Sequence, residues 1–217
     1  MCRFISIQGT SFDPVQLRPA LDKLERGEPV VVPTETVYGL ACRPDIPGAV
    51  ERVFSLKGRP DSKPLPRMVA SIAAVRAQVC RWPEAAERLA TRFWPGPLTL
   101  VLDAPGNTTL AFRIPDHPVL LALLRACPQP LAVTSANRSG ENETHTAADA
   151  GAALGDADLL ILDAGPSAWG RPSTIVDLSG VNGTPRILRE GAIDREQIER
   201  VIDATGHPGL GCGHNDG

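Results

Sequence analysis

Long apolar runs are absent from this chain of 217 residues. None approaches the roughly 18 to 20 apolar residues that a membrane-spanning helix needs, so contact with a membrane is not expected. The opening residues, Met-Cys-Arg-Phe-Ile-Ser-Ile-Gln, also lack the apolar stretch and the cleavage site of a secretory signal. The sequence therefore predicts a cytoplasmic protein.

Closely spaced cysteines are missing as well. The five cysteines are far apart and no C-x-x-C pair occurs, so neither a zinc ribbon nor a disulfide framework is indicated. The chain also lacks the P-loop, the dinucleotide G-x-G-x-x-G motif, the G-x-S-x-G nucleophile elbow and the H-E-x-x-H zinc helix. With only four scattered histidines, we expect no protein side chain to bind a metal and none to act as a catalytic nucleophile.

An excess of basic charge is the third absence. The chain carries 22 basic and 25 acidic residues, a net charge of −3, and only 4% of its residues are aromatic. Proteins that bind nucleic-acid phosphates broadly are usually strongly basic, and those that bind single strands use stacking aromatics. These figures argue against a general nucleic-acid binder but leave room for a local basic pocket.

Apolar runs alternate with stretches of helical periodicity along the whole chain, which is typical of a layered α/β domain. About seven strands and six or seven helices are predicted in one unit. Because some strand pairs are separated by turns and others by helices, we expect a mixed sheet. The predicted strands are 29–33, 98–102, 110–114, 131–133, 159–162, 174–178 and 186–188, and the predicted helices are 15–26, 47–56, 71–80, 83–93, 118–126, 147–154 and 194–204.

Polar residues gather at the ends of several predicted elements, where sites form in α/β sheets. Residues 33–40 place two threonines, a glutamate and a tyrosine after a valine-rich strand, and residues 131–140 place hydroxyls and an amide after another. Each segment is explained equally well as a turn whose side chains satisfy the backbone. From local sequence alone the structural and functional interpretations of these segments both stay open.

Residues 57–65 combine three cations with a glycine and two prolines. A helix dipole accounts for Lys57 at a helix end, but not for Arg59 and Lys63 on a stiff loop. Like charges held close together cost energy unless an anion lies between them, so this segment predicts a phosphate or carboxylate site. Arg113 and Arg189 interrupt apolar strand patterns, and each could face either solvent or a cleft as an anion clamp.

Seven motifs, taken in this order, closely resemble the YrdC-like family of threonylcarbamoyl-AMP synthases. The resemblance covers about residues 13–204. The motifs are Pro-Thr-Glu-Thr-Val-Tyr-Gly-Leu, Lys-Gly-Arg-Pro with Lys-Pro-Leu, Trp-Pro-Gly-Pro-Leu-Thr, Phe-Arg-Ile-Pro-Asp-His-Pro, Thr-Ser-Ala-Asn-Arg-Ser-Gly, Ser-Thr-Ile-Val-Asp-Leu and Arg-Glu-Gly.

This resemblance implies an α/β fold with a twisted mixed sheet and a concave, positive cavity. It implies a YrdC-like catalytic domain over 1–205, of the short single-domain type, with 206–217 as a flexible Gly-rich tail. The family signature falls on Lys57, Arg59, Ser135 and Asn137, which would be the catalytic residues. Thr34, Thr36, Arg113 and Ser173 would hold threonine, and the nucleotide would contact Arg59, Lys63, Thr109, Ser135, Asn137 and Arg189. Met68 stands where some relatives have a histidine.

The activity that the resemblance implies is a nucleotidyl transfer. Threonylcarbamoyl-AMP and pyrophosphate would form from L-threonine, bicarbonate and ATP, with Mg²⁺ as the cofactor that accompanies ATP. The product would pass to transferase proteins that modify an adenosine of tRNA next to the anticodon. Two alternatives remain open at this point: a carbamoyl-adenylate-forming maturation factor of the same fold, and an RNA-binding or ribosome-assembly module with weak RNA affinity.

Overall fold

The computed structural model describes residues 2–7, 9, 12–58, 64–155, 158–180 and 185–203. The predicted tail, 206–217, lies outside this part of the chain. The strands are β1 (Arg3–Ser6), β2 (Val30–Val32), β3 (Gly39–Cys42), β4 (Arg67–Met68), β5 (Leu98–Ala104), β6 (Thr108–Arg113), β7 (Leu131–Ser135), β8 (Leu160–Asp163), β9 (Thr174–Asp177) and β10 (Arg186–Arg189). The helices are a 3₁₀ turn (Pro14–Leu17), α1 (Arg18–Glu25), α2 (Ala49–Lys57), α3 (Ile72–Arg76), α4 (Glu84–Phe93), α5 (Pro118–Ala126), α6 (Ala147–Leu154) and α7 (Arg195–Asp203).

All strands of the described chain join one sheet, in the order β1-β8-β2-β3-β7-β4-β6-β5-β9-β10. β8 pairs in parallel with β1 and β2, and β4–β6 and β5–β9 are parallel as well, whereas β2–β3, β3–β7, β4–β7, β5–β6 and β9–β10 are antiparallel. The predicted α/β class with a mixed sheet is therefore confirmed.

The predicted number of about seven strands is wrong, because the described residues form ten. The missed strands are β1, β3 and β4. β4 has only two residues, and β1 is largely exposed. β3 is buried along its whole length, but it follows directly from a polar segment whose sequence is typical of a turn. Pairing with distant strands, rather than local pattern, makes these segments extended.

Short-range signals placed the helices more successfully. The Ser71 hydroxyl accepts from the amide of Ala74 at 3.2 Å and starts α3, although that helix ends at Arg76 and not near residue 80. Thr146 caps α6 in the same way through the amide of Asp149, at 3.1 Å. Gly58 ends α2 in the left-handed conformation with φ 58°, which glycine adopts without strain.

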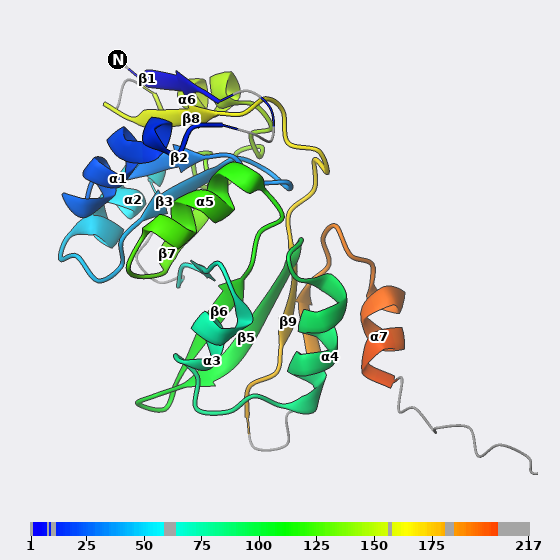
Figure 1. Cartoon of the computed structure of the whole chain (residues 1–217). Helices are drawn as coiled ribbons and strands as arrows, with labels where there is room; N and C mark the ends of the chain where they lie inside the picture. Colours follow the sequence, from blue (N-terminus) through cyan, green and yellow to red (C-terminus); the bar gives the residue numbers. More distant parts are fainter. Residues whose placement is uncertain are drawn as a thin grey trace, which may run out of the picture.

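The sheet is divided into two packed regions (Figure 1). In the region of β8, β2, β3 and β7, α1 and α5 contribute to one apolar cluster, and α2 and α6 contribute to another. In the region of β5, β6 and β9, a third cluster forms with α3, α4 and α7. Since each region buries its own apolar side chains, the boundary between them is free to hold polar residues.

Alternation along the strands sends polar side chains away from the third cluster. Leu98, Leu100 and Phe112 belong to that cluster, whereas their neighbours Thr99 and Arg113 line a cavity instead. Successive residues of a strand point to opposite faces, so this is the face turned away from α3, α4 and α7. None of the helices in the described residues is long and apolar enough to cross a membrane.

Candidate active site

A cavity of about 260 Å³ lies where the two regions of the sheet meet. The turn between β2 and β3 and the end of β7 line it from one region, and β5, β6, β9 and β10 line it from the other. Its lining residues are Thr34, Thr36, Val37, Tyr38, Gly39, Pro64, Pro66, Met68, Thr99, Arg113, Val133, Thr134, Ser135, Glu143, Pro172, Ser173, Ile175 and Arg189.

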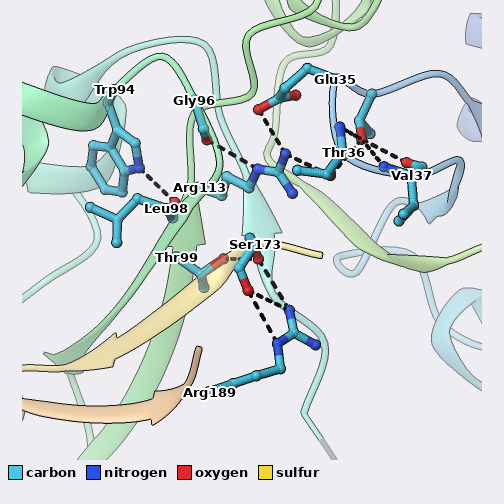
Figure 2. A network of polar contacts seen from close by, with 11 residues as sticks. Glu35, Thr36, Val37, Trp94, Gly96, Leu98, Thr99, Arg113, Ser173 and Arg189 are labelled. Atoms are coloured by element: carbon cyan, nitrogen blue, oxygen red, sulfur yellow. Dashed lines mark hydrogen bonds and ion pairs between the residues drawn. The ribbon is translucent and has the colours of Figure 1, made fainter. Parts of the chain in front are cut away.

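Arg113 is fixed on three sides at this cavity (Figure 2). Its Nη2 donates to Glu35 Oε1 at 2.7 Å and to Thr36 Oγ1 at 2.9 Å, while its Nε donates to the carbonyl of Gly96 at 3.2 Å. The side chains of Arg113 and Glu35 are each only 5% exposed. A guanidinium carries five N–H donors, so donors remain for a ligand after these contacts.

The Trp-Pro-Gly-Pro-Leu-Thr motif forms the turn that supplies the Gly96 carbonyl. The Trp94–Pro95 peptide bond is cis, and Trp94 Nε1 donates to the carbonyl of Leu98 at 2.7 Å. Gly96 has φ 159°, and a Cβ there would lie 2.5 Å from the carbonyl oxygen of Phe93. The motif therefore forms a turn whose Gly96 carbonyl accepts a hydrogen bond from Arg113.

Arg189 approaches the same cavity from β10 (Figure 2). Its Nε and Nη2 donate to the carbonyl of Ser173 at 3.1 and 2.9 Å, and Nη2 also reaches Ser173 Oγ at 3.2 Å. Ser173 Oγ lies 2.9 Å from Thr99 Oγ1. Burial lowers the pKa of Arg189, nearby Glu143 raises it and the like charge of Arg113 lowers it further.

Two arginines that share one cavity form a site for anions. Their mutual repulsion is relieved when a carboxylate or a phosphate lies between them, and the hydroxyls of Thr36 and Ser173 add hydrogen-bonding groups at the same place. Within the described part of the chain, no group of three or more His, Cys, Asp or Glu could hold a metal ion. The cavity is thus suited to anion binding by arginine and hydroxyl groups.

Thr34 and Tyr38 are largely committed to the local backbone. Thr34 Oγ1 accepts from the amides of Thr36 and Val37, both at 3.1 Å, and lies 2.6 Å from the carbonyl of Val37. Tyr38 is fully buried, its hydroxyl donates to the carbonyl of Gly165 at 2.7 Å, and burial raises its pKa to about 12. The turn interpretation therefore holds for Thr34, which also lines the cavity.

Lys57 contacts the Ser135–Asn137 corner. Its Nζ donates to the carbonyls of Ser135 and Asn137 at 2.5 and 2.6 Å, and to Asn137 Oδ1 at 3.4 Å. The amide of Ser139 in turn donates to the Lys57 carbonyl at 2.9 Å. Lys57 is 3% exposed. A buried ammonium is stable only when oxygen atoms surround it, as these carbonyls do. Lys57 therefore holds the Ser135–Asn137 backbone in place beside the cavity.

The structure brings most of the predicted site residues together, but not all. Thr34, Thr36, Arg113, Ser135, Ser173 and Arg189 line the cavity, and Lys57 and Asn137 lie directly behind Ser135. Thr109 pairs with Asp103 in the β5–β6 hairpin and lines a different hollow with Cys80 and Arg81. Arg59 and Lys63 lie outside the described residues.

Local sequence patterns do not single out three polar residues at the cavity: Thr99 and Glu143, which line it, and Glu35, which contacts Arg113. Thr99 belongs to a quoted motif, and the alternation of β5 was the signal that it faces away from the apolar cluster. Glu35 stands between the two threonines that were selected, and its role appears only with its partner Arg113. Glu143 carries no local signal, since it lies in a loop that reads as solvent-exposed.

Comparison with known proteins agrees with this geometry. The family model Sua5_yciO_yrdC, described as telomere recombination, matches residues 22–191. The chain belongs to the Sua5/YciO/YrdC family. The predicted YrdC-like membership is thereby confirmed, and the matched segment carries all the cavity-lining residues of this Sua5/YciO/YrdC domain.

Several relatives of this Sua5/YciO/YrdC protein are named threonylcarbamoyl-AMP synthase. A threonylcarbamoyl-AMP synthase of Bacillus subtilis is 40% identical over 200 residues, which are 88% of this chain and 57% of that protein. One from Vibrio cholerae is 35% identical over 81% of this chain and 97% of its own length. The structure of Pyrococcus abyssi Sua5 complexed with L-threonine superposes with a TM-score of 0.86 at 35% identity, covering 92% of this chain and 61% of that one.

Proposed function

We propose that this protein is an L-threonylcarbamoyladenylate synthase, which forms threonylcarbamoyl-AMP and pyrophosphate from L-threonine, bicarbonate and ATP. The chain spans 57% of the length of its Bacillus subtilis relative, so the activity of that longer protein is here a proposal. The observation that carries it is the cavity lined by Arg113 and Arg189 together with the hydroxyls of Thr36, Ser135 and Ser173.

The amino acid is assigned to the Arg113 end of the cavity. Arg113, Thr36 and Ser173 offer guanidinium and hydroxyl groups, which suit a substrate with a carboxylate and a hydroxyl. The Pyrococcus abyssi relative, which shares this fold, has been solved in complex with L-threonine, and this supports threonine as the amino acid. The nucleotide is assigned to the part of the cavity around Arg189, and Ser135, which also lines the cavity, is proposed as a further contact.

The reaction needs charge stabilisation more than a nucleophilic side chain. The amine of threonine adds CO₂ from bicarbonate to form a carbamate, and a carbamate oxygen attacks the α-phosphorus of ATP while pyrophosphate leaves. Negative charge spreads over phosphate oxygens during this step, so fixed cations and N–H donors lower its barrier. Holding three substrates in one cavity supplies the remaining acceleration.

Mg²⁺ is proposed to enter with ATP. This ion binds through phosphate oxygens and only one or two carboxylates, so a cage of protein ligands is not required. Glu143 lines the cavity and lies near Arg189, at the end assigned to the nucleotide, so its carboxylate is the candidate ligand on the protein. Mg²⁺ would neutralise charge on the phosphates there.

The product is a mixed anhydride and therefore an activated acyl donor. We propose that transferase proteins consume it by moving the threonylcarbamoyl group to an adenosine of tRNA. A role as an RNA-binding module, or as a carbamoyl-adenylate-forming maturation factor, has no specific support from the cavity and is tested by the same assay.

The test is pyrophosphate release from ATP, with mass spectrometry of the nucleotide product. We expect release only when threonine and bicarbonate are both present, and a product whose mass is that of threonylcarbamoyl-AMP. Equal release with either substrate omitted would contradict the proposal. RNA affinity that falls with salt, without nucleotide turnover, would favour the RNA-binding alternative.

A further inference from the structure

The two arginines of the cavity differ in their partners. Arg113 forms a buried ion pair with Glu35, at 2.7 Å between Nη2 and Oε1. Arg189 contacts Ser173, and among the described residues no carboxylate lies within ion-pair distance of it. Glu143 raises the pKa of Arg189 from farther away. One end of the cavity is thus neutralised by a direct pair, and the other keeps more of its positive charge.

We propose that Glu35 is a positioning residue that sorts the two anionic substrates between the ends of the cavity. By neutralising Arg113, it leaves a site strong enough for one carboxylate but too weak for a polyphosphate. The polyphosphate then binds at the more positive Arg189 end. This inference rests on the proposed function, since it concerns the ends assigned there to threonine and ATP.

The hydrogen-bond geometry explains how one residue does this. Glu35 Oε1 and Thr36 Oγ1 both accept from Nη2 of Arg113, and the Gly96 carbonyl accepts from its Nε. In Figure 2, Glu35 contacts Arg113 from one side, while Ser173 and Arg189 lie on the other. The amide of Trp169 holds the Glu35 backbone carbonyl at 2.9 Å, which fixes the segment that carries the carboxylate.

Burial makes the charge of Glu35 effective. The Arg113–Glu35 pair is surrounded by protein rather than water. Water therefore does not screen the effect of the Glu35 charge on Arg113 as it would at the surface. Without that charge, Arg113 and Arg189 would both attract phosphate oxygens. Threonine and ATP would then compete for the same cations.

The test compares Glu35→Gln with the wild-type protein. Glu35→Gln keeps an acceptor for Arg113 but removes the charge. We expect its KM for threonine to rise about tenfold or more, with kcat changed less than about threefold. Inorganic tripolyphosphate, used as a probe, should compete only with ATP in the wild type and with both ATP and threonine in Glu35→Gln.

Two further variants separate charge, position and stability. Glu35→Asp keeps the charge but shortens the reach to Arg113, so its KM for threonine should rise while tripolyphosphate still competes only with ATP. Asp177→Asn removes another buried carboxylate, which pairs with Arg186 at 2.5 Å and does not line the cavity. This change should alter neither the KM for threonine nor the inhibition by tripolyphosphate.

Each outcome decides one point. An unchanged threonine KM and an unchanged inhibition pattern in Glu35→Gln overturn the inference. If Glu35→Gln does not fold, Glu35→Asp decides, because an unchanged threonine KM there also overturns it. If the wild-type protein releases no pyrophosphate with threonine, bicarbonate and ATP, the proposed function has failed, which is a different result from a working enzyme whose Glu35 variants behave like wild type.

Discussion

At the residue scale, the same side chain can satisfy both a structural and a chemical pattern. The family signature predicts Lys57 as a catalytic residue, and its ammonium lies among the oxygens of Ser135 and Asn137. Its charge holds the corner that presents Ser135 to the cavity. Only the contacts of the folded chain distinguish this arrangement from a direct anion clamp.

Replacement of Lys57 by Met tests that arrangement. The change keeps the length of the side chain but leaves two buried carbonyls and the Asn137 amide oxygen without their donor, which costs about 1–3 kcal/mol per unsatisfied group. We expect the free energy of unfolding to fall by about that amount or more and activity to fall with it, as measured by urea unfolding and pyrophosphate release. Loss of activity with unchanged stability would instead indicate a direct catalytic contact.

Thr99 offers a second test at this scale. In Thr99→Val the hydroxyl that lies 2.9 Å from Ser173 Oγ is lost while the shape is kept. Ser173 then loses the partner that orients it toward the cavity. A hydrogen bond contributes about 0.5–1.5 kcal/mol, so we expect the KM for threonine to rise roughly two- to tenfold. Steady-state kinetics checks this, and an unchanged KM would show that Ser173 is oriented by Arg189 alone.

At the element scale, the approach of β10 to the loop before β9 forms the Arg189 end of the cavity. Gly191 follows Glu190 just beyond the end of β10, and a Cβ there would lie 2.2 Å from the carbonyl oxygen of Pro172 and 2.7 Å from that of Ser173. The atoms it would meet are backbone, so they cannot move aside as a flexible side chain can. Close packing against the backbone of Pro172 and Ser173 therefore requires the glycine of the closing Arg-Glu-Gly motif.

Replacement of Gly191 by Ala should separate these two segments. We expect a loss of stability of about 1–3 kcal/mol from overpacking, and a raised KM for ATP because Arg189 is displaced from Ser173. Thermal unfolding and kinetics measure the two effects. Gly151→Ala is the matched control. The atoms nearest to its Cβ would belong to the side chains of Ile161, at 3.1 Å, Phe4 and Cys2, which can shift, so a milder effect is expected there.

At the scale of the whole molecule, the response of stability to acid depends on carboxylates that are paired in the fold. Hydrogen bonds from Arg26 and Lys23 lower the pKa of Glu28 from 4.5 to about 2. These contacts join the end of α1 to the segment before β2. Since the folded pKa lies below the unfolded one, the pair stabilises the protein fully above about pH 4.5, and this contribution is lost as the pH falls toward 2.

Replacement of Glu28 by Gln should therefore reduce the acid dependence of stability. We expect the variant to be less stable than wild type at pH 6 and the difference to shrink as the pH falls from 4.5 toward 2. Thermal unfolding at a series of pH values measures it, with Glu196→Gln on the exposed face of α7 as the control. A difference that does not change with pH would show that packing, and not the charge, is responsible.

The sequence by itself determined the α/β class, most helices and the family. Helix starts follow from short-range signals such as Ser71 and Thr146, whose partners lie three residues away. The motifs also marked most of the residues that meet at the cavity, because each has an unusual polar residue at the end of an apolar strand. These properties depend on contacts or patterns within a few residues.

Only the tertiary structure decided the strands β1, β3 and β4, the place of Thr109 outside the cavity, and the different partners of Arg113 and Arg189. Each depends on contacts between segments far apart in the chain, such as Glu35 with Arg113 and Lys57 with Ser135. Local patterns carry little information on such pairs, because the same polar residue is equally compatible with solvent, a turn or a buried partner until the sheet brings the segments together.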